Sequence, residues 1–236
     1  MKTAELKELL KKVALTTALL CMGITAFTSC AKNPAAPKLY YQGHASVRIT
    51  TPENKVIYVD PYTGDGYDAG ADLILITHGH QDHNKTQLIT NRNEDCQIIT
   101  HEEAVTDDGH QSFDLGFVKI DAVQAQNKNH DPAKCVGYVL TFSNGVQLYL
   151  SGDTSATEQM GDLKARKIDY AFFCTDGTYN MDIEEAAQCA KLMGAKHNTP
   201  YHLPHDKENP FDRSFAESFA VDGLLVVAPG ETIALE

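Results

Sequence analysis

Residues 73–83 read Leu73-Ile74-Leu75-Ile76-Thr77-His78-Gly79-His80-Gln81-Asp82-His83. The apolar run at the start predicts a buried strand, and the pattern H-x-H-x-D-H follows it directly. Imidazole and carboxylate groups are ligands that divalent transition metals accept readily. His78 and His80, which are two positions apart on a loop, can turn both rings toward one ion, while Asp82 and His83 can hold a second. The segment therefore predicts a metal centre at the end of a rigid strand.

The composition limits the classes of protein to which this chain can belong. With 236 residues, of which 42% are hydrophobic, it can bury a full core in one domain or in two small ones. The net charge of -12 repels phosphate backbones, so nucleic acid is not expected as a partner. A small-molecule substrate is expected instead, and a homo-oligomer remains open.

The N-terminus resembles an export signal. A Lys-Lys pair precedes an apolar stretch that is interrupted by threonines and is too short to span a membrane. The stretch ends in Phe27-Thr28-Ser29-Cys30, which resembles a bacterial lipoprotein cleavage site. We expect residues 1–29 to be a signal peptide and Cys30 to carry the lipid, with an uncleaved amphipathic helix as the alternative. The mature protein would then be a membrane-anchored lipoprotein facing the periplasm or the cell surface.

A short tether and one folded domain are expected after the cleavage site. Residues 30–38 contain two prolines and read as the tether, and the domain covers residues 39–236. Strands are expected at 47–49, 55–59, 72–77, 96–100, 117–120, 137–142, 146–150, 168–174 and 224–227. Helices are expected at 84–91, 182–193 and 214–220. Because strands cluster in both halves, with helices between and after them, two sheets packed face to face with helices outside are expected.

Two later segments offer further metal ligands. Ser151-Gly152-Asp153-Thr154 follows a predicted strand, where the glycine lets the backbone approach closely and the aspartate lies at the sheet edge. Asp153 could bridge two ions because a carboxylate has two oxygens, although an ordinary helix cap is the alternative. His202, at the end of Thr199-Pro200-Tyr201-His202, is expected as the last ligand.

The third ligand of the first ion is less determined. Residues 125–130 read Ala125-Gln126-Asn127-Lys128-Asn129-His130 and offer either His130 or the weaker ligand Asn127. His44 and His205 are expected behind the ligands or facing the substrate, and Asp60 is expected behind the ligands. His101 and His110 read as solvated loop histidines, with His101 near enough to a strand to approach the cleft, and His197 reads as structural.

These motifs together resemble the metallo-β-lactamase-fold hydrolases. The H-x-H-x-D-H loop, Asp60-Pro61, Gly152-Asp153-Thr154 and Pro200-Tyr201-His202 occur in the order found in that family. The segments Gly43-His44-Ala45-Ser46 and Thr178-Tyr179-Asn180-Met181-Asp182 look most like the branch that contains ascorbate-6-phosphate lactonases. The resemblance covers about residues 39–236, which would form the metallo-hydrolase domain. It implies an α+β fold, a four-layer αββα sandwich of two mixed β-sheets flanked by helices, with the metals at one edge between the sheets.

The resemblance also implies a ligand set and two divalent ions, with Zn or Mn favoured and Fe²⁺ open. His78, His80 and Asp153 would hold one ion, and Asp82, His83, His202 and Asp153 the other. Many relatives place a histidine where this chain has Asn127, so either His130 fills the first site from a shifted position or that site is weaker.

The expected reaction is hydrolysis by a metal-activated hydroxide that attacks a carbonyl or a phosphorus. Asp82 would orient or deprotonate the nucleophile, and His205 or His44 would donate a hydrogen bond to the leaving oxygen. A small lactone, an ester or a phosphorylated sugar derivative is the expected substrate. The alternatives are a phosphodiesterase for a lipid or small-molecule phosphodiester, a non-catalytic periplasmic metal-binding protein, and a relative that binds a small molecule without metal.

Overall fold

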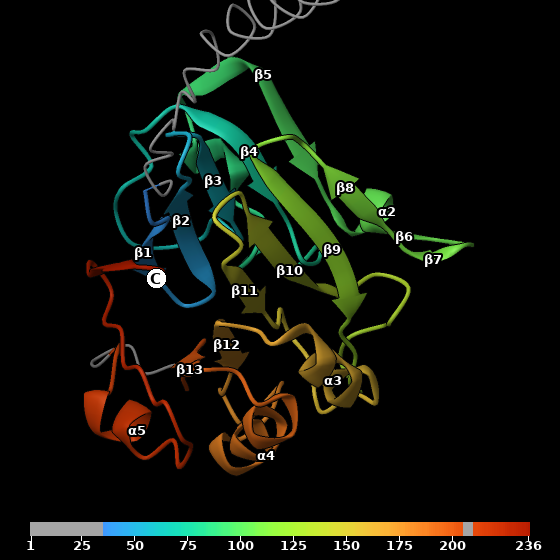
Figure 1. The fold of residues 1–236 in the computed structure, drawn as a ribbon. Helices are drawn as coiled ribbons and strands as arrows, with labels where there is room; N and C mark the ends of the chain where they lie inside the picture. The colour runs from blue at the N-terminus through green and yellow to red at the C-terminus, as the bar shows by residue number, and fades with distance from the viewer. Residues whose placement is uncertain (1–34, 205–209) are drawn as a thin grey trace, which may run out of the picture. The chain divides into compact units, whose positions relative to one another are not determined.

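Two six-stranded sheets face each other in the part of the chain that the structure, a computed structural model, describes: residues 35–204 and 210–236 (Figure 1). The first sheet has the order β14-β1-β2-β3-β4-β5, and its strands are β1 (Lys38–Gly43), β2 (Ser46–Thr50), β3 (Val56–Val59), β4 (Ala71–Leu75), β5 (Arg92–Ile99) and β14 (Thr232–Ala234). The β3, β4 and β5 strands are parallel, and the other pairs are antiparallel. The sheet is therefore mixed, as the sequence predicts.

The second sheet repeats this arrangement with the order β13-β12-β11-β10-β9-β8. Its strands are β8 (Ser112–Asp114), β9 (Val118–Gln124), β10 (Val136–Phe142), β11 (Gln147–Leu150), β12 (Tyr170–Cys174) and β13 (His197–Tyr201). The β11, β12 and β13 strands are parallel, and the β8 to β11 strands are antiparallel. A separate two-stranded ribbon pairs β6 (Val105–Thr106) with β7 (Gly109–His110).

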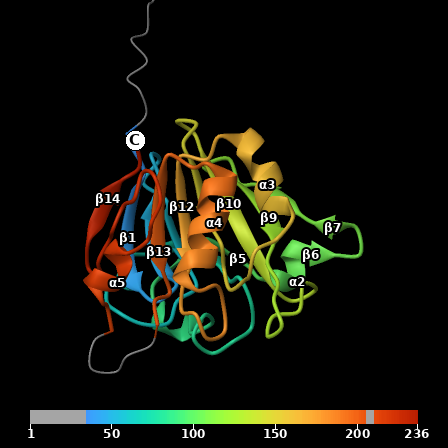
Figure 2. The ribbon, with the colours of Figure 1, turned by 90° about the horizontal axis from the view of Figure 1, so that it is seen from below.

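Helices cover the outer face of the second sheet (Figure 2). The described helices are α2 (His101–Ala104), α3 (Gln159–Asp162), α4 (Ile183–Met193) and α5 (Arg213–Glu217), with 3₁₀ turns η1 (Thr86–Leu88) and η2 (Leu163–Arg166). The longest, α4, begins where the Asp182 side chain accepts a hydrogen bond from the Glu185 N–H. It ends at Gly194, whose φ of 70° is the left-handed conformation that favours glycine. Its buried alanines, cysteine and methionine face β12 and β13.

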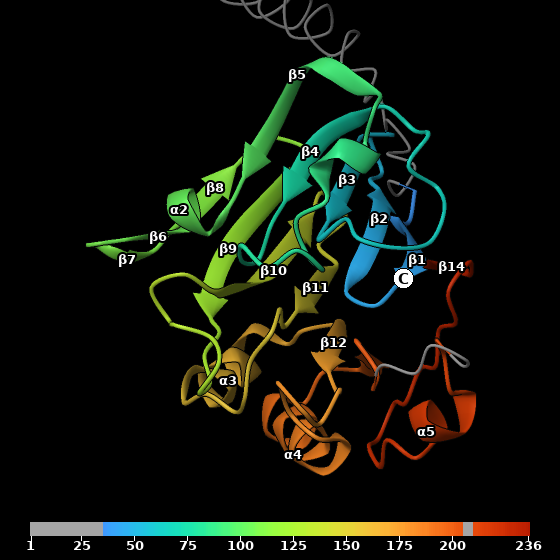
Figure 3. The same ribbon diagram turned by 180° about the vertical axis from the view of Figure 1, so that it is seen from behind.

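The strand β4 is buried along its whole length because it lies between two apolar clusters. Leu73 and Leu75 belong to the main core between the sheets, whereas Ile74 and Ile76 belong to a second cluster with Tyr58 and other residues on the outer face. Alternate side chains of a strand point to opposite faces, so a strand covered on both faces reads as a continuous apolar run. Loops and η1 lie on this outer face (Figure 3).

The predicted fold class is confirmed, but two predicted elements are wrong. Residues 84–91 form only the 3₁₀ turn η1, because Leu88 and Ile89 are adjacent and give no helical stripe of apolar residues. The Arg92 guanidinium instead bonds to the carbonyls of Thr86 and Ile89. Residues 224–227 are not a strand either; Leu224 alone bridges to β13, and the last strand is β14.

The predicted signal peptide, the lipidated Cys30 and most of the tether lie outside the described residues. None of the helices within residues 35–204 and 210–236 has the length and hydropathy needed to cross a bilayer.

Candidate metal centre

The loop after β4 carries the H-x-H-x-D-H motif and is attached to both sheets. On the first sheet, Asp60 follows β3 and accepts hydrogen bonds from the backbone N–H of Thr77 at 2.8 Å and from its hydroxyl at 2.7 Å. On the second sheet, the Val136 N–H donates to the Thr77 carbonyl, and His78 forms a β-bridge with Cys135. The loop is therefore fixed by bonds that do not depend on a metal.

Asp60 also orients one of the histidines. Its Oδ2 lies 2.8 Å from Nδ1 of His83, which places a proton on Nδ1 and turns Nε2 toward the centre. Burial opposes a charge on His83, but the carboxylates of Asp153 and Asp60 on either side raise the pKa of its imidazole well above the usual value. Asp60 itself has a φ of 46°, a strained conformation for a non-glycine residue, as do His44 and His202.

Asp153 presents one carboxylate oxygen to each of two histidine groups. Its Oδ1 lies 3.4 Å from Nε2 of His83 and 3.5 Å from Nε2 of His202. Its Oδ2 lies 3.4 Å from Nε2 of His130 and 3.9 Å from Nε2 of His78. The carboxylate is only 4% exposed, yet the surrounding histidines hold its pKa well below the usual value against the effect of burial. Each carboxylate oxygen thus faces a different histidine group.

The first group consists of His78, His80 and His130, whose ring nitrogens lie within 4.8 Å of one another. Nε2 of His78 and Nδ1 of His80 are 3.0 Å apart. Burial lowers the pKa of His78 to about 2, so its ring is neutral at neutral pH and keeps a lone pair for a metal. The structure thus brings His130, rather than Asn127, to the two histidines of the loop.

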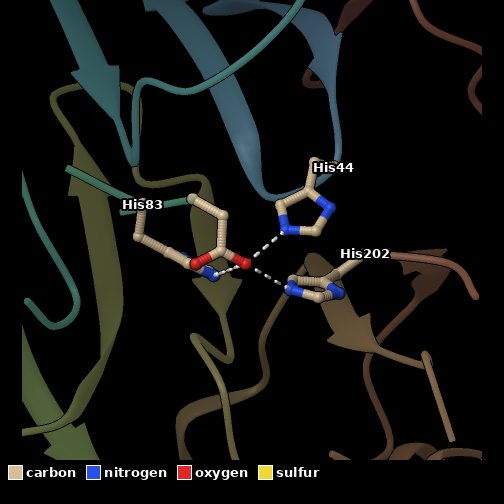
Figure 4. A group of neighbouring side chains, drawn as sticks. His44, His83 and His202 are labelled. Carbon is tan, nitrogen blue, oxygen red and sulfur yellow. Dashed lines mark hydrogen bonds and ion pairs between the residues drawn. The ribbon is translucent and has the colours of Figure 1, made fainter. Parts of the chain in front are cut away.

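The second group consists of Asp82, His83, His202 and His44. The three histidine rings surround one carboxylate (Figure 4), and Oδ2 of Asp82 lies 3.0 Å from Nε2 of His44 and 3.9 Å from Nε2 of both His83 and His202. The rings of His44 and His202 lie with their centroids 3.6 Å apart and their planes tilted by 39°. His44 therefore lies directly against a candidate ligand, Asp82.

The residues of both groups fit divalent ions. Nε2 of His83, His130 and His202 and Oδ1 of Asp153 are buried and have no hydrogen-bond partner within the described residues. Burying a polar atom without a partner is costly. Four such atoms gathered around the Asp153 carboxylate therefore indicate that bound cations would satisfy them. A tetrahedral ion with bonds of about 2.1 Å needs ligand atoms about 3.4 Å apart, which matches the distances around Asp153. Nitrogen and carboxylate ligands without cysteine suit Zn²⁺ or Mn²⁺.

A chain of polar side chains lies behind the histidines and was missed by the sequence analysis apart from Asn127. Oδ1 of Asn127 lies 2.9 Å from Nδ1 of His130, and its amide donates to Oδ1 of Asn180. Asn180 donates to Asp176 at 2.6 Å, and Asp176 lies 3.6 Å from Nδ1 of His202. Asp176 follows β12 as Asp153 follows β11, so an aspartate just past a buried strand was the available signal.

The remaining predicted histidines are distributed as follows. His101 lines a cavity together with His78, His80 and His130, so it approaches the centre from α2. His197 stacks on the ring of Tyr170 with centroids 4.7 Å apart, away from the centre. His205, predicted to contact the substrate, lies outside the described residues.

Gly152 lets the second sheet approach the metal-binding loop, which gives a testable prediction. Its φ is 60°, and a Cβ atom there would lie 2.5 Å from the Val136 carbonyl and 3.1 Å from Cβ of Thr77. We expect Gly152→Ala to lower the free energy of unfolding by at least about 3 kcal/mol, from backbone strain and this clash together. Gly145→Ala is the matched control because its φ is 87° but no atom lies within 4 Å, so strain alone should cost about 1 kcal/mol. Equal losses in urea unfolding would contradict the close approach.

Comparison with known proteins identifies proteins that are similar to this chain in sequence and in structure. A family profile described as "Beta-lactamase superfamily domain" matches residues 38–202. A "UPF0173 metal-dependent hydrolase" from Geobacillus thermodenitrificans is 31% identical over 228 residues, which cover 84% of this chain and 100% of the relative. The "UPF0173 metal-dependent hydrolase YtkL" of Bacillus subtilis is 29% identical, with 84% and 100% covered. The solved structure of a metallo hydrolase from the archaeon Ignicoccus hospitalis superimposes with a TM-score of 0.68 at 24% identity, covering 85% of this chain and 99% of that protein.

Proposed function

Because the chain belongs to the metal-dependent hydrolases of the β-lactamase superfamily, we propose that it uses two divalent ions, Zn²⁺ or Mn²⁺, to hydrolyse a small lactone or ester. The single observation that supports this proposal is the placement of Asp153, which faces one histidine group with each carboxylate oxygen. His78, His80 and His130 would hold one ion. Asp82, His83 and His202 would hold the other, and Asp153 would bridge the two.

The ions, Asp82 and His44 would have different roles in the reaction. Bound divalent ions lower the pKa of a water molecule and polarise a carbonyl group. Burial raises the pKa of Asp82, but the hydrogen bond from His44 and the neighbouring His83 lower it more, so this carboxylate stays ionised. Ionised Asp82 can accept a hydrogen bond from the attacking water and so orient it. Burial lowers the pKa of His44 to about 4, so a neutral ring donates Nε2–H to Asp82 and holds it in place.

Metal analysis and a substrate panel test the proposal together. We expect about two equivalents of metal in the purified protein by plasma mass spectrometry. We expect hydrolysis of γ-lactones or aryl esters that is lost with chelator and restored by Zn²⁺ or Mn²⁺. Preferential cleavage of bis-(p-nitrophenyl) phosphate would instead indicate a phosphodiesterase. Two bound ions with no hydrolysis of any lactone, ester, phosphomonoester or phosphodiester would indicate a metal-binding protein without catalysis.

Removing the metal is also expected to lower thermal stability. Ligands from both sheets hold the ions, so binding stabilises the folded state and not the unfolded chain. An ion present at about 1000 times its dissociation constant adds about 4 kcal/mol, which corresponds to roughly 10 °C for a domain of this size. Calorimetry of the protein with chelator and with Zn²⁺ measures the difference. An unchanged melting temperature, with metal binding shown in parallel, would contradict ligation between the sheets.

A further inference from the structure

Two cavities that share three lining residues lie next to the second histidine group. The first, called the metal-side cavity, has a volume of about 380 Å³, and Asp82, Asp176, Thr178 and His202 give it a polar wall. The second, called the side cavity, has a volume of about 280 Å³. His44, Tyr62 and Leu203 line both cavities, so the two spaces adjoin along these three side chains.

The wall of the side cavity is apolar where that of the metal-side cavity is polar. It is formed mainly by Tyr41, Tyr62, Leu203, Pro204, Pro210 and Pro229. Among the described lining residues of the side cavity there is no Lys, Arg, Asp or Glu. Lys85 holds its ammonium over the Tyr62 ring at 4.2 Å, but it lines neither cavity. Such a wall favours an uncharged hydrocarbon group over a charged group, because burying an unpaired charge is costly.

We propose that the side cavity binds an uncharged, apolar arm of the substrate while the scissile carbonyl lies in the metal-side cavity. The inference rests on the proposed hydrolase function and narrows its substrate class to esters or lactones with an alkyl or aromatic substituent. The described part of this wall offers apolar contacts to an alkyl or aromatic arm and no cation to a phosphorylated one.

Hydroxamates test the side cavity because their two oxygens bind metal ions in the same way whatever the arm. The zinc-loaded full chain is titrated calorimetrically with acetohydroxamate, hexanohydroxamate and succinohydroxamate, the last with a carboxylate at the end of its arm. Burying one methylene gives about a fourfold gain. Partial burial of the four extra methylenes should therefore make hexanohydroxamate bind at least 10-fold more tightly than acetohydroxamate. Succinohydroxamate should show no such gain.

A variant whose side cavity is filled by a larger side chain provides the matched comparison with the unaltered protein. Thr63 is exposed, lines the side cavity and is not one of the proposed ligands, so Thr63→Trp should fold and should block the arm. This variant is expected to bind the acetyl and hexanoyl probes with similar affinity. Thr90→Trp, at an exposed threonine that lines neither cavity, should keep the difference of the unaltered protein.

Three outcomes would overturn the inference. Equal affinity for the acetyl and hexanoyl probes in the unaltered protein would mean that the side cavity takes no arm. Tighter binding of succinohydroxamate would mean that it takes an anion. The proposed function would stand in both cases because acetohydroxamate still binds the ions. Failure of every hydroxamate to bind would overturn the metal-centred function as well.

Discussion

Replacement of Asp153 by asparagine is expected to lower hydrolysis by on the order of 1000-fold and to reduce the bound metal from two equivalents to one or fewer. The carboxylate faces four histidine nitrogens at 3.4 to 3.9 Å, two with each oxygen. An amide keeps the size of the side chain but has one neutral oxygen, so it cannot bridge two cations. Metal ions contribute several kcal/mol to the transition state, which corresponds to a rate factor of about that size.

Asp169→Asn is the matched control for this variant. Asp169 is also a buried carboxylate, 9% exposed, but it lies just before β12 and bonds to the Gln147 N–H and the Lys196 ammonium. We expect this control to lose stability and to keep both ions. Metal content and lactone or ester turnover are measured side by side on the two proteins. Two equivalents of metal in Asp153→Asn would show that the carboxylate does not bridge.

The second large effect is expected at Asp60, which touches no ion. In Asp60→Asn, Oδ1 must still accept from the Thr77 N–H, so the amide nitrogen takes the place of Oδ2 beside Nδ1 of His83. Nδ1 then has to accept, and the imidazole proton moves to Nε2, where it blocks the nitrogen that faces the ions. We expect the affinity of the second site for Zn²⁺ to fall by about 10- to 100-fold, the usual cost of removing the group that orients a metal-binding histidine.

A competition titration with a coloured chelator measures this loss. Asp72→Asn is the control, because Asp72 also accepts hydrogen bonds within the first sheet, from the Val56 N–H and the Lys55 ammonium, but at the opposite end of β4. It should lower stability and leave zinc affinity unchanged. If Asp60→Asn lowered stability alone, Asp60 would be a structural residue and not one that sets the His83 tautomer.

The loop after β4 could be singled out from the sequence as a candidate metal centre because its residues are close together in the sequence. The apolar run of β4 and the four ligand residues of the motif are contiguous, so their relation to one another does not depend on the rest of the fold. The same holds for Gly152-Asp153, where a strand, a glycine and a carboxylate follow each other directly. Periodicity also gave most strands and α4, whose cap and terminal glycine are local signals.

Features that depend on contacts between distant parts of the chain were predicted without their contacts, as for His44, or were missed. His44 lies against His202 because the His202 N–H donates to the His44 carbonyl across 158 residues of sequence, from the turn between β1 and β2 to the end of β13. Asp176 and Asn180 gain their position from Asn127, on another connection of the second sheet. No spacing or periodicity in the sequence encodes these pairings. The apolar segment 224–227 was wrongly predicted to be a strand for the same reason, because its pairing depends on β13, with which only Leu224 forms a bridge.

The hydrogen bond between Asn127 and His130 links the two positions that the sequence analysis could not separate. Oδ1 of Asn127 holds Nδ1 of His130 and the Asn129 N–H, so the amide shapes the turn from which His130 reaches the ions. A histidine at position 127 would bring a ring nitrogen of its own but would take away this acceptor. The two positions are therefore coupled, and Asn127 cannot be exchanged for another ligand without also releasing the ring of His130 and the turn that carries it.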